Sequence, residues 1–349
     1  MEKLKEIINN HQFSNDTLDR VLSKGTLHGA LTELSTARTF KEMYPTHEAV
    51  FTKIFETMRL KAGDMCLCGY RISKCWERIY DHKRNCLKMQ YRCKMCDKGK
   101  NVYSPLALTP LKGVHKPLDQ ILEIAFKLIN DKRGVSATQI SRDYGWKYDA
   151  SLHILRRIRI WMGISVGFFK FEDNIVECDE TYISIPTGLG RNIVRTRGIG
   201  SERKQPVFGI VERNGRKARA WVLDDANRAN IQPKIQQTVS TSVPVFTDGS
   251  PIYKYLSSAG YVHEECNHSQ KKWAVDHVNT NKIESFNALL KGQMGVTHKG
   301  VSKEHLQKYL DEACFRFAHP YAFEGIEALF NILPPLNIKR KIVPNVNLN

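Results

Sequence analysis

Apolar residues recur with a helical spacing through the first half of the chain. After a proline-rich connector, a segment beginning at Leu118 repeats apolar side chains at intervals of three and four residues, which predicts an amphipathic helix. Ser136 is placed as the N-cap of a short second helix that breaks at Tyr144-Gly145, and a longer helix runs on to Met162. Two helices that meet at a glycine-containing turn indicate a helix-turn-helix, although the bare pattern fits a plain helical hairpin equally well.

The spacing changes to that of β-strands at residue 176. The run VECDETYI (176–183) alternates apolar and polar residues, and PVFGIVERNGRKARAWVL (206–223) contains two strand-like runs joined at Asn214-Gly215, a strong hairpin signal. A helix over ANIQPKIQQTV (229–239) and a short apolar strand ending at Asp248 come next. Three strands, a helix, a strand and a helix in this order predict an RNase H-like domain with a mixed five-stranded sheet.

The first of these strands carries an acid at an inward position. A buried carboxylate such as that of Asp179 has to be paired, hydrogen-bonded or bound to a metal. In the RNase H-like order, strands one and four are neighbours, so Asp179 is expected beside Asp248, and Glu284 opens a helix that can point to the same place. Three converging carboxylates predict a two-metal phosphoryl-transfer site with two Mg²⁺ or Mn²⁺ ions. Lys291 follows Glu284 by about two helical turns, on the same face, and is expected to meet the phosphate backbone.

The formal net charge of +17, with a pI near 9.4, favours a polyanionic partner. A merely soluble basic protein is the alternative. The chain has no run of eighteen apolar residues, and its N-terminus is charged and amphipathic, unlike a signal peptide. We therefore expect double-stranded DNA and no membrane as partner, in the cytoplasm or nucleoid, or in the nucleus of a eukaryotic host. In the helix-turn-helix interpretation, the residues expected to contact DNA are Lys147, Tyr148, Ser151, His153, Arg156, Arg157 and Arg159.

Six of the nine cysteines lie within one window of 31 residues, which indicates metal binding in a chain without a secretion signal. Cys93 and Cys96 form a CxxC pair typical of tetrahedral zinc, and Cys66 and Cys68 form a pair that is one residue shorter. We expect these four to hold a structural zinc. Substitute ligands, should the short pair not serve, are Cys75, His82 and Cys86, and reduced cysteines in a core are the alternative to a metal site.

The blocks VECDETYI, PVFGIVERNG, VFTDGSPIYKYL, HEECNHS and HVNTNKIESFNALLKGQMGVTHKG resemble those of the DDE transposases of bacterial insertion sequences related to eukaryotic Merlin elements. The upstream stretches MYPTHEAVFTKIFETMRLKAGDMCLCG and YRCKMCDKGKNVYSPLALTPLKG are similar to the zinc ribbon of that family and its lead-in, so the resemblance covers about residues 40 to 320. It implies that Asp179, Asp248 and Glu284 are the catalytic triad and that Lys291 is the basic residue that follows it. Some members have Asn as the third ligand, which makes Asn281 an alternative to Glu284.

Further candidates surround these blocks. The basic, glycine-containing segment GLGRNIVRTRGIGSERKQ, with Arg191, Arg195 and Arg197, is expected either to order on DNA or to be a solvated linker. Histidines near scissile phosphates can donate hydrogen bonds or move protons, and structural histidines are commoner. His268 and His277 are the leading candidates because they are close to Glu284, ahead of His263 and His298.

These observations predict a multidomain α+β or α/β protein. The expected parts are an N-terminal helical region (1–60), a zinc ribbon (61–112), a helix-turn-helix domain (113–168), an RNase H-like catalytic domain (169–325) and a C-terminal tail (326–349). The expected function is that of a transposase that binds the ends of its element, cleaves them and joins the 3′-hydroxyls to target DNA, as a homodimer because two ends must be held together. A non-catalytic DNA-binding protein and an RNase H-like nuclease without strand transfer are the alternatives.

Overall fold

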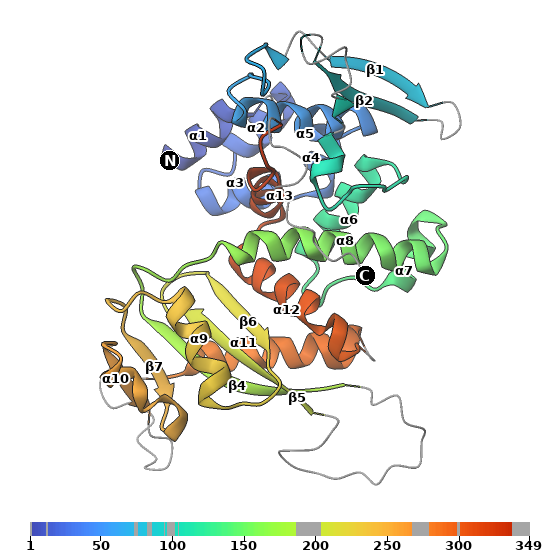
Figure 1. Cartoon of the computed structure of the whole chain (residues 1–349). Helices are drawn as coiled ribbons and strands as arrows, with labels where there is room; N and C mark the ends of the chain where they lie inside the picture. The colour runs from blue at the N-terminus through green and yellow to red at the C-terminus, as the bar shows by residue number, and fades with distance from the viewer. Residues whose placement is uncertain are drawn as a thin grey trace. The chain divides into compact units, whose positions relative to one another are not determined.

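The computed structural model describes residues 2–11, 13–72, 76–81, 86–93, 95, 102–103, 105–185, 204–266, 279–298 and 301–336 (Figure 1). The chain divides into two compact units. One unit comprises Met1–Trp161 together with Pro320–Asn349, and the other comprises Met162–His319. The range predicted for a zinc ribbon falls in the first unit, and the range predicted for a helix-turn-helix domain lies in the first unit up to Trp161. Both domains remain predictions.

Five helices open the first unit. Four of them begin at a Ser or Thr whose side-chain oxygen accepts a backbone N–H of the first helical turn, because these N–H groups have no partner within a helix. The caps are Ser14, Thr26, Thr36 and Thr46. The helices are α1 (Glu2–Asn10), α2 (Asn15–Leu22), α3 (Leu27–Leu34), α4 (Ala37–Met43) and α5 (His47–Lys61).

A small antiparallel sheet with the strand order β1-β2-β3 follows α5. Three more helices come next, and capping signals explain the boundaries of the short middle one, α7 (Ala137–Tyr144). Ser136 accepts the N–H of Gln139 at 3.1 Å, as expected, and Gly145 ends the short helix with a left-handed φ of 65°. The elements are β1 (Trp76–Asp81), β2 (Cys86–Arg92), β3 (Val102–Tyr103), η3 (Pro105–Leu108), α6 (Leu118–Asn130), α7 (Ala137–Tyr144) and α8 (Tyr148–Gly167).

Two boundaries differ from the predicted ones. Helix α8 continues past Met162 to Gly167, because Ser165 and Val166 keep its helical pattern of buried positions. The predicted tail begins inside a helix, α13 (Ala322–Asn331), in which Ile326 and Leu329 are buried. Apolar residues at helical spacing explain this helix, and the sequence analysis did not use them.

The second unit contains a five-stranded mixed sheet with the order β6-β5-β4-β7-β8. Strands β4, β5 and β6 are antiparallel, whereas β7 runs parallel to β4, and β8 runs parallel to β7. The first and fourth strands of the domain are therefore neighbours, as predicted. The elements are β4 (Val176–Ser184), β5 (Lys204–Glu212), β6 (Ala218–Val222), α9 (Arg228–Thr238), β7 (Val245–Asp248), η4 (Pro251–Tyr253), α10 (Tyr255–Ser258), β8 (His263–Cys266), α11 (Asn281–Gly292), the π-helix η6 (Gln293–Thr297) and α12 (Lys303–Ala318).

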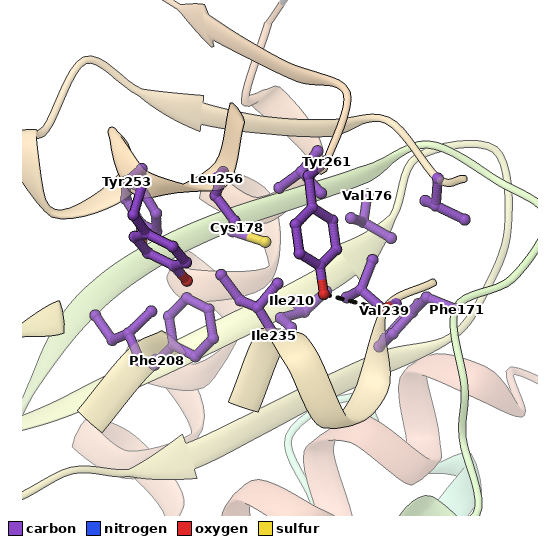
Figure 2. Packing of buried hydrophobic residues seen from close by; sticks show 14 of the residues in the cluster. Phe171, Val176, Cys178, Phe208, Ile210, Ile235, Val239, Tyr253, Leu256 and Tyr261 are labelled. Carbon is purple, nitrogen blue, oxygen red and sulfur yellow. Dashed lines mark hydrogen bonds between the residues drawn. The ribbon is translucent and has the colours of Figure 1, made fainter. Parts of the chain in front are cut away.

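Alternate residues of the central strands face different layers. Cys178 of β4 and Phe208 and Ile210 of β5 belong to a hydrophobic core with Ile235 of α9 and Leu256 of α10 (Figure 2). Within it, the Tyr261 hydroxyl donates a hydrogen bond to the Val239 carbonyl at 3.3 Å. The residues between these positions face the opposite side of the sheet, where α11 packs on β4 and β5.

The outer strand β6 is covered by a side chain. Gln307 of α12 accepts the N–H of Val222 at 3.0 Å and donates to the carbonyl of Ala220 at 2.9 Å. These two bonds have the pattern that a further strand would make. The edge of the sheet is therefore satisfied where α12 lies against it.

Candidate active site

Strand β4 presents two different faces to the candidate site. Its alternation points Cys178 and Glu180 to the side of α9 and α10, and points Glu177 and Asp179 to the side of α11. An acid therefore reaches both faces of the sheet within four residues.

Asp179 and Asp248 occupy equivalent positions on adjacent parallel strands. The register pairs Glu177 of β4 with Phe246 of β7. Asp179 lies two residues after Glu177, and Asp248 lies two residues after Phe246. Parallel strands form their ligand-binding crevice at their carboxyl ends, which is where this position falls. The pairing of β4 with β7, which brings Asp248 near Asp179, is the juxtaposition that the sequence order predicted.

The surroundings of Asp179 disfavour its negative charge. Burial, the nearby Glu180 carboxylate and the charge of Asp248 together raise the pKa of Asp179 to about 7, although a hydrogen bond from Asn287 Nδ2 to Asp179 Oδ2 at 2.8 Å acts against this. The neighbouring carboxylates thus repel one another across this edge. Such an arrangement is stabilised by a cation bound between them.

Glu180 lies on the other face of β4 and accepts a hydrogen bond there. The hydroxyl of the buried Tyr253 donates to Glu180 Oε1 at 2.5 Å, and burial together with Asp248 raises the pKa of Glu180. Glu180 also lines a cavity of about 460 Å³ that runs along the carboxyl half of β4. The cavity is lined by Glu180, Thr181, Tyr182, Ile183, Ser184, Lys204, Lys291, Met294 and Gly295.

Glu284 lies in the first turn of α11, as predicted, and its side chain is exposed. Its Oε1 accepts a hydrogen bond from Thr280 Oγ1 at 3.0 Å. Burial, and after it the charge of Glu284, raise the pKa of Cys266, which pairs with Asp248 across β7 and β8. Glu284 is therefore near the same edge of the sheet. Within the described ranges, however, the three carboxylates are not gathered closely enough to form a ready three-residue metal group.

Two residues of this site, Glu177 and Asn287, were not among the predicted ones. Glu177 is fully buried, and its Oε2 accepts the backbone N–H groups of Lys282 and Ile283 at 2.8 and 3.0 Å. Burial raises the pKa of Glu177. The two backbone hydrogen bonds and Arg213, whose Nε lies 3.4 Å from Glu177 Oε1, lower it. Asn287 holds Asp179 from the same helix. The available signal for Glu177 was its position two residues before Asp179, which places both acids on one face of the strand.

The comparison with known families decides the identity of this region. Residues 172–318 match the model of the ISXO2-like transposase domain. This part of the chain is a transposase domain. The resemblance to insertion-sequence transposases inferred from the sequence is confirmed.

Other known proteins are similar to the transposase domain or to larger parts of the chain. An uncharacterized protein in transposable element ISH50 of Halobacterium salinarum is 27% identical over 168 residues, which are 45% of this chain and 56% of that relative. The chain thus spans little more than half the length of this relative. The structure of the Mos1 strand transfer complex matches 60% of this chain and 74% of its own chain, with 14% identity and a TM-score of 0.27. The structure of a pre-cleavage Mos1 transpososome matches 60% of this chain and 75% of its own, with 14% identity and a TM-score of 0.26.

The supporting residues predicted for the transposase domain have different locations. Lys291 is exposed and lines the cavity with Glu180, whereas Asn281 is exposed at the start of α11. His263 Nε2 lies 2.9 Å from Thr247 Oγ1, and His298 is buried against Tyr309. The other predicted residues, namely His268, His277, Arg191, Arg195 and Arg197, lie outside the described residues.

Three of the predicted zinc ligands gather in the other unit. The ligand atoms of Cys66, Cys68 and Cys93 all lie within 4.8 Å of one another, and the sulfurs of Cys68 and Cys93 are 3.4 Å apart. Gly69 closes the short first pair with a left-handed φ of 82°, which shows how a CxC can turn back on itself. Among the described residues, this is the only group of three or more such side chains that could hold one metal ion.

The substitute zinc ligands are placed less favourably or not described. Cys86 is the first residue of β2, and Cys93 directly follows the last. About 20 Å of extended strand therefore separates the two residues. The length of this strand favours the other candidates over Cys86 as ligands in a site that contains Cys93. Cys96, Cys75 and His82 lie outside the described residues.

The predicted DNA-contacting residues of α8 divide into exposed and buried ones. Lys147, Tyr148 and His153 are exposed, and Arg156 and Arg157 are partly exposed. Arg157 donates to the Pro110 carbonyl at 2.9 Å. Ser151 and Arg159 are both buried, so this structure does not present either side chain to DNA, and their assignment as DNA contacts stays a prediction. The Ser151 hydroxyl donates to the Lys147 carbonyl at 3.2 Å.

In the described part of the chain, no helix is long and apolar enough to cross a bilayer.

Proposed function

We propose that this chain is a DNA transposase that binds the terminal inverted repeats of its insertion sequence, cleaves the ends and joins the freed 3′-hydroxyls to target DNA. The observation that carries the proposal is the placement of Asp179 and Asp248 at equivalent positions of adjacent parallel strands, close enough for the charge of Asp248 to raise the pKa of Asp179. The family match supports the same chemistry.

Asp179, Asp248 and Glu284 are the proposed ligands of two Mg²⁺ or Mn²⁺ ions. Their oxygen donors and mutual repulsion fit such ions, which when bound would activate the attacking oxygen and stabilise the leaving oxygen of the phosphodiester. Glu284 is exposed, so its side chain has room to turn from Thr280 toward the two aspartates. Asn287 holds one oxygen of Asp179 and thereby orients the carboxylate.

The DNA strand is proposed to follow the cavity beside β4. Lys204 and Lys291 line this cavity together with Glu180, so cationic side chains lie next to the acids where a phosphate backbone would pass. The proposed contacts of the helix-turn-helix are Lys147, Tyr148, His153, Arg156 and Arg157, all at least partly exposed. Pairing of two ends requires two active sites, for which we propose a homodimer on DNA.

We propose a structural zinc held by Cys66, Cys68 and Cys93, with Cys96 as the fourth ligand. The three gathered sulfurs fit this ion, and a site closed by four thiolates leaves no position for a reacting water. In this proposal, zinc supports folding and end recognition, and the carboxylates carry out the reaction.

The deciding experiment is a cleavage and joining assay on DNA that carries the genomic ends of the element, with Mg²⁺ or Mn²⁺. We expect cleavage and joining by the wild type, and loss of both to below detection in Asp179→Asn, Asp248→Asn and Glu284→Gln with end binding retained. Glu304→Gln is the matched control for Glu284→Gln, because Glu304 is also exposed in the first turn of a helix.

Each contrary result identifies an alternative. Cleavage without joining indicates a nuclease, and end binding without any cleavage indicates a non-catalytic DNA-binding protein. Wild-type cleavage by Glu284→Gln would transfer the third ligand position to another residue, for which Asn281 is the first candidate.

A further inference from the structure

The start of helix α11 is capped by a residue that lies about a hundred positions earlier in the chain. The first N–H groups of a helix have no partner inside it, and they are usually satisfied by the N-cap side chain. Here the N-cap residue, Thr280, makes no such bond, and its hydroxyl donates to Glu284 instead. The N–H groups of Lys282 and Ile283 are bound by the Glu177 carboxylate of β4, at 2.8 and 3.0 Å.

A second bond fixes the same helix one turn later. Asn287 Nδ2 donates to Asp179 Oδ2 at 2.8 Å. Two residues of strand span about 6.6 Å, and the four residues from Ile283 to Asn287 rise about 6 Å along the helix, so the two contacts match in spacing. Glu284 lies between them. These two contacts with β4 therefore fix the position and the orientation of the helical turn that carries Glu284.

The packing beneath this turn leaves little room for another arrangement. A Cβ atom on Gly209 of β5 would lie 3.0 Å from Ile283 Cδ1, so α11 packs closely on the sheet here and a larger residue would require the Ile283 side chain to shift. Arg213 Nε lies 3.4 Å from the second oxygen of Glu177, which keeps a cation beside this fully buried carboxylate. A charged acceptor at a helix N-terminus also interacts favourably with the helix dipole.

We propose that Glu177 is a positioning residue of the active site: by capping α11 from β4, it holds Glu284 in place relative to Asp179 and Asp248. Glu177 touches neither DNA nor metal in this account. The inference rests on the proposed function, because it assigns Glu177 a purpose in assembling the proposed metal ligands.

The experiment compares Glu177→Gln and Glu177→Asp with the wild type in two measurements. Hydrogen exchange reports the protection of the Lys282 and Ile283 amides, and titration with Mn²⁺ alone reports the assembly of the carboxylates without DNA or turnover. The matched control is Glu212→Gln, because Glu212 is also a buried strand glutamate that accepts a backbone N–H, that of Lys217 in the hairpin loop, at 3.2 Å.

For Glu177→Gln we expect faster exchange at the two amides and an affinity for Mn²⁺ lowered by about tenfold or more, the range seen when groups that orient metal ligands are removed. The control should leave both unchanged. A folded variant with exposed amides and wild-type Mn²⁺ affinity would show a merely structural cap and overturn the proposal. Unchanged hydrogen exchange at the Lys282 and Ile283 amides in Glu177→Gln would also overturn it.

Two further outcomes keep the result interpretable. If Glu177→Gln does not fold, Glu177→Asp takes its place, since the shorter side chain keeps the charge but withdraws it from the amides, and the same criteria apply. If the wild type binds Mn²⁺ no better than Asp179→Asn, the proposed function fails and this inference fails with it. Wild-type binding that depends on Asp179 but not on Glu177 removes the inference alone.

Discussion

Individual acids in the transposase domain are fully or partly withdrawn from solvent for different reasons. Glu177 caps a helix, Asp179 faces Asp248 at the sheet edge, and Asp311 of α12 accepts a hydrogen bond from Gln307 Nε2 at 2.8 Å. Asp311 lies away from the proposed metal ligands in the chain and has no assigned role in the reaction. Burial raises its pKa to about 6, with Gln307 and Arg219 opposing this effect. Its charge is thus a cost to stability near neutral pH.

Replacing Asp311 by Asn should stabilise the protein at pH 8 and stabilise it clearly less at pH 4.5. An acid with a higher pKa in the folded than in the unfolded state holds its proton more tightly when folded, so wild-type stability falls as the pH rises from about 4 to about 6. The shift in the pKa of Asp311 corresponds to about 2 kcal/mol in the free energy of unfolding, after allowance for the partial exposure of the residue. Urea denaturation at the two pH values measures the difference in the free energy of unfolding.

The matched control for this prediction is Asp224→Asn. Asp224 has an exposed side chain that forms a surface ion pair with Lys303, so the change should be below about 0.5 kcal/mol at pH 8. A loss of stability in Asp311→Asn at pH 8 would contradict the prediction.

At the scale of elements, helix α12 completes the sheet through Gln307. Replacing Gln307 by Ala leaves the N–H of Val222 and the carbonyl of Ala220 without this partner, which should lower the free energy of unfolding by about 1–3 kcal/mol. Chemical denaturation measures it. Gln236→Ala, at an exposed position of α9, is the control and should change stability by less than about 0.5 kcal/mol. Equal effects of the two substitutions would show that the edge contacts contribute nothing.

Local patterns were sufficient to predict the central elements of the transposase domain. The alternation around Asp179 defined β4, Asn214-Gly215 marked the β5–β6 hairpin, and the apolar run before Asp248 marked β7. Each signal lies within about ten residues of chain. The adjacency of β4 and β7 then followed from the order of elements, since few topologies accommodate that order.

Features that depend on partners distant in sequence were not predicted. The cap of α11 joins Glu177 to amides more than a hundred residues away, and no spacing in the sequence reveals this bond. The same holds for Ser151 and Arg159, which have surface-type side chains but fall on the buried face of α8. Periodicity along a helix identifies a face, and tertiary packing determines how much of the helix is covered.

For the molecule as a whole, the positive charge predicts DNA binding that weakens with salt. Lys147→Ala and Arg156→Ala should each reduce the slope of log K against log salt by about 1, because each removes one phosphate contact. Fluorescence anisotropy with DNA from the element ends, at several salt concentrations, measures the slope. Ser151→Ala is the control, and it should affect stability and leave the slope unchanged, since its side chain is buried. Unchanged slopes in the first two variants would remove α8 from the DNA interface.

The cysteine cluster predicts one zinc per chain. Cys68→Ser and Cys93→Ser should each reduce the zinc content to below half an equivalent, because each removes a sulfur from the gathered group. Cys86→Ser is the matched control and should keep a full equivalent, since strand β2 separates Cys86 from Cys93. Metal analysis of the purified proteins decides between these outcomes. Full zinc retention in the first two variants would exclude this cluster.

The hydrogen bonds of Gln307 also restrict how two copies of the chain can associate. Sheets of separate subunits often merge by adding strand to strand, which needs unpaired N–H and carbonyl groups along an edge. On β6 the groups of Val222 and Ala220 are already bound by a side chain of the same chain. The proposed homodimer therefore cannot extend its sheet across β6 at these residues without displacing Gln307.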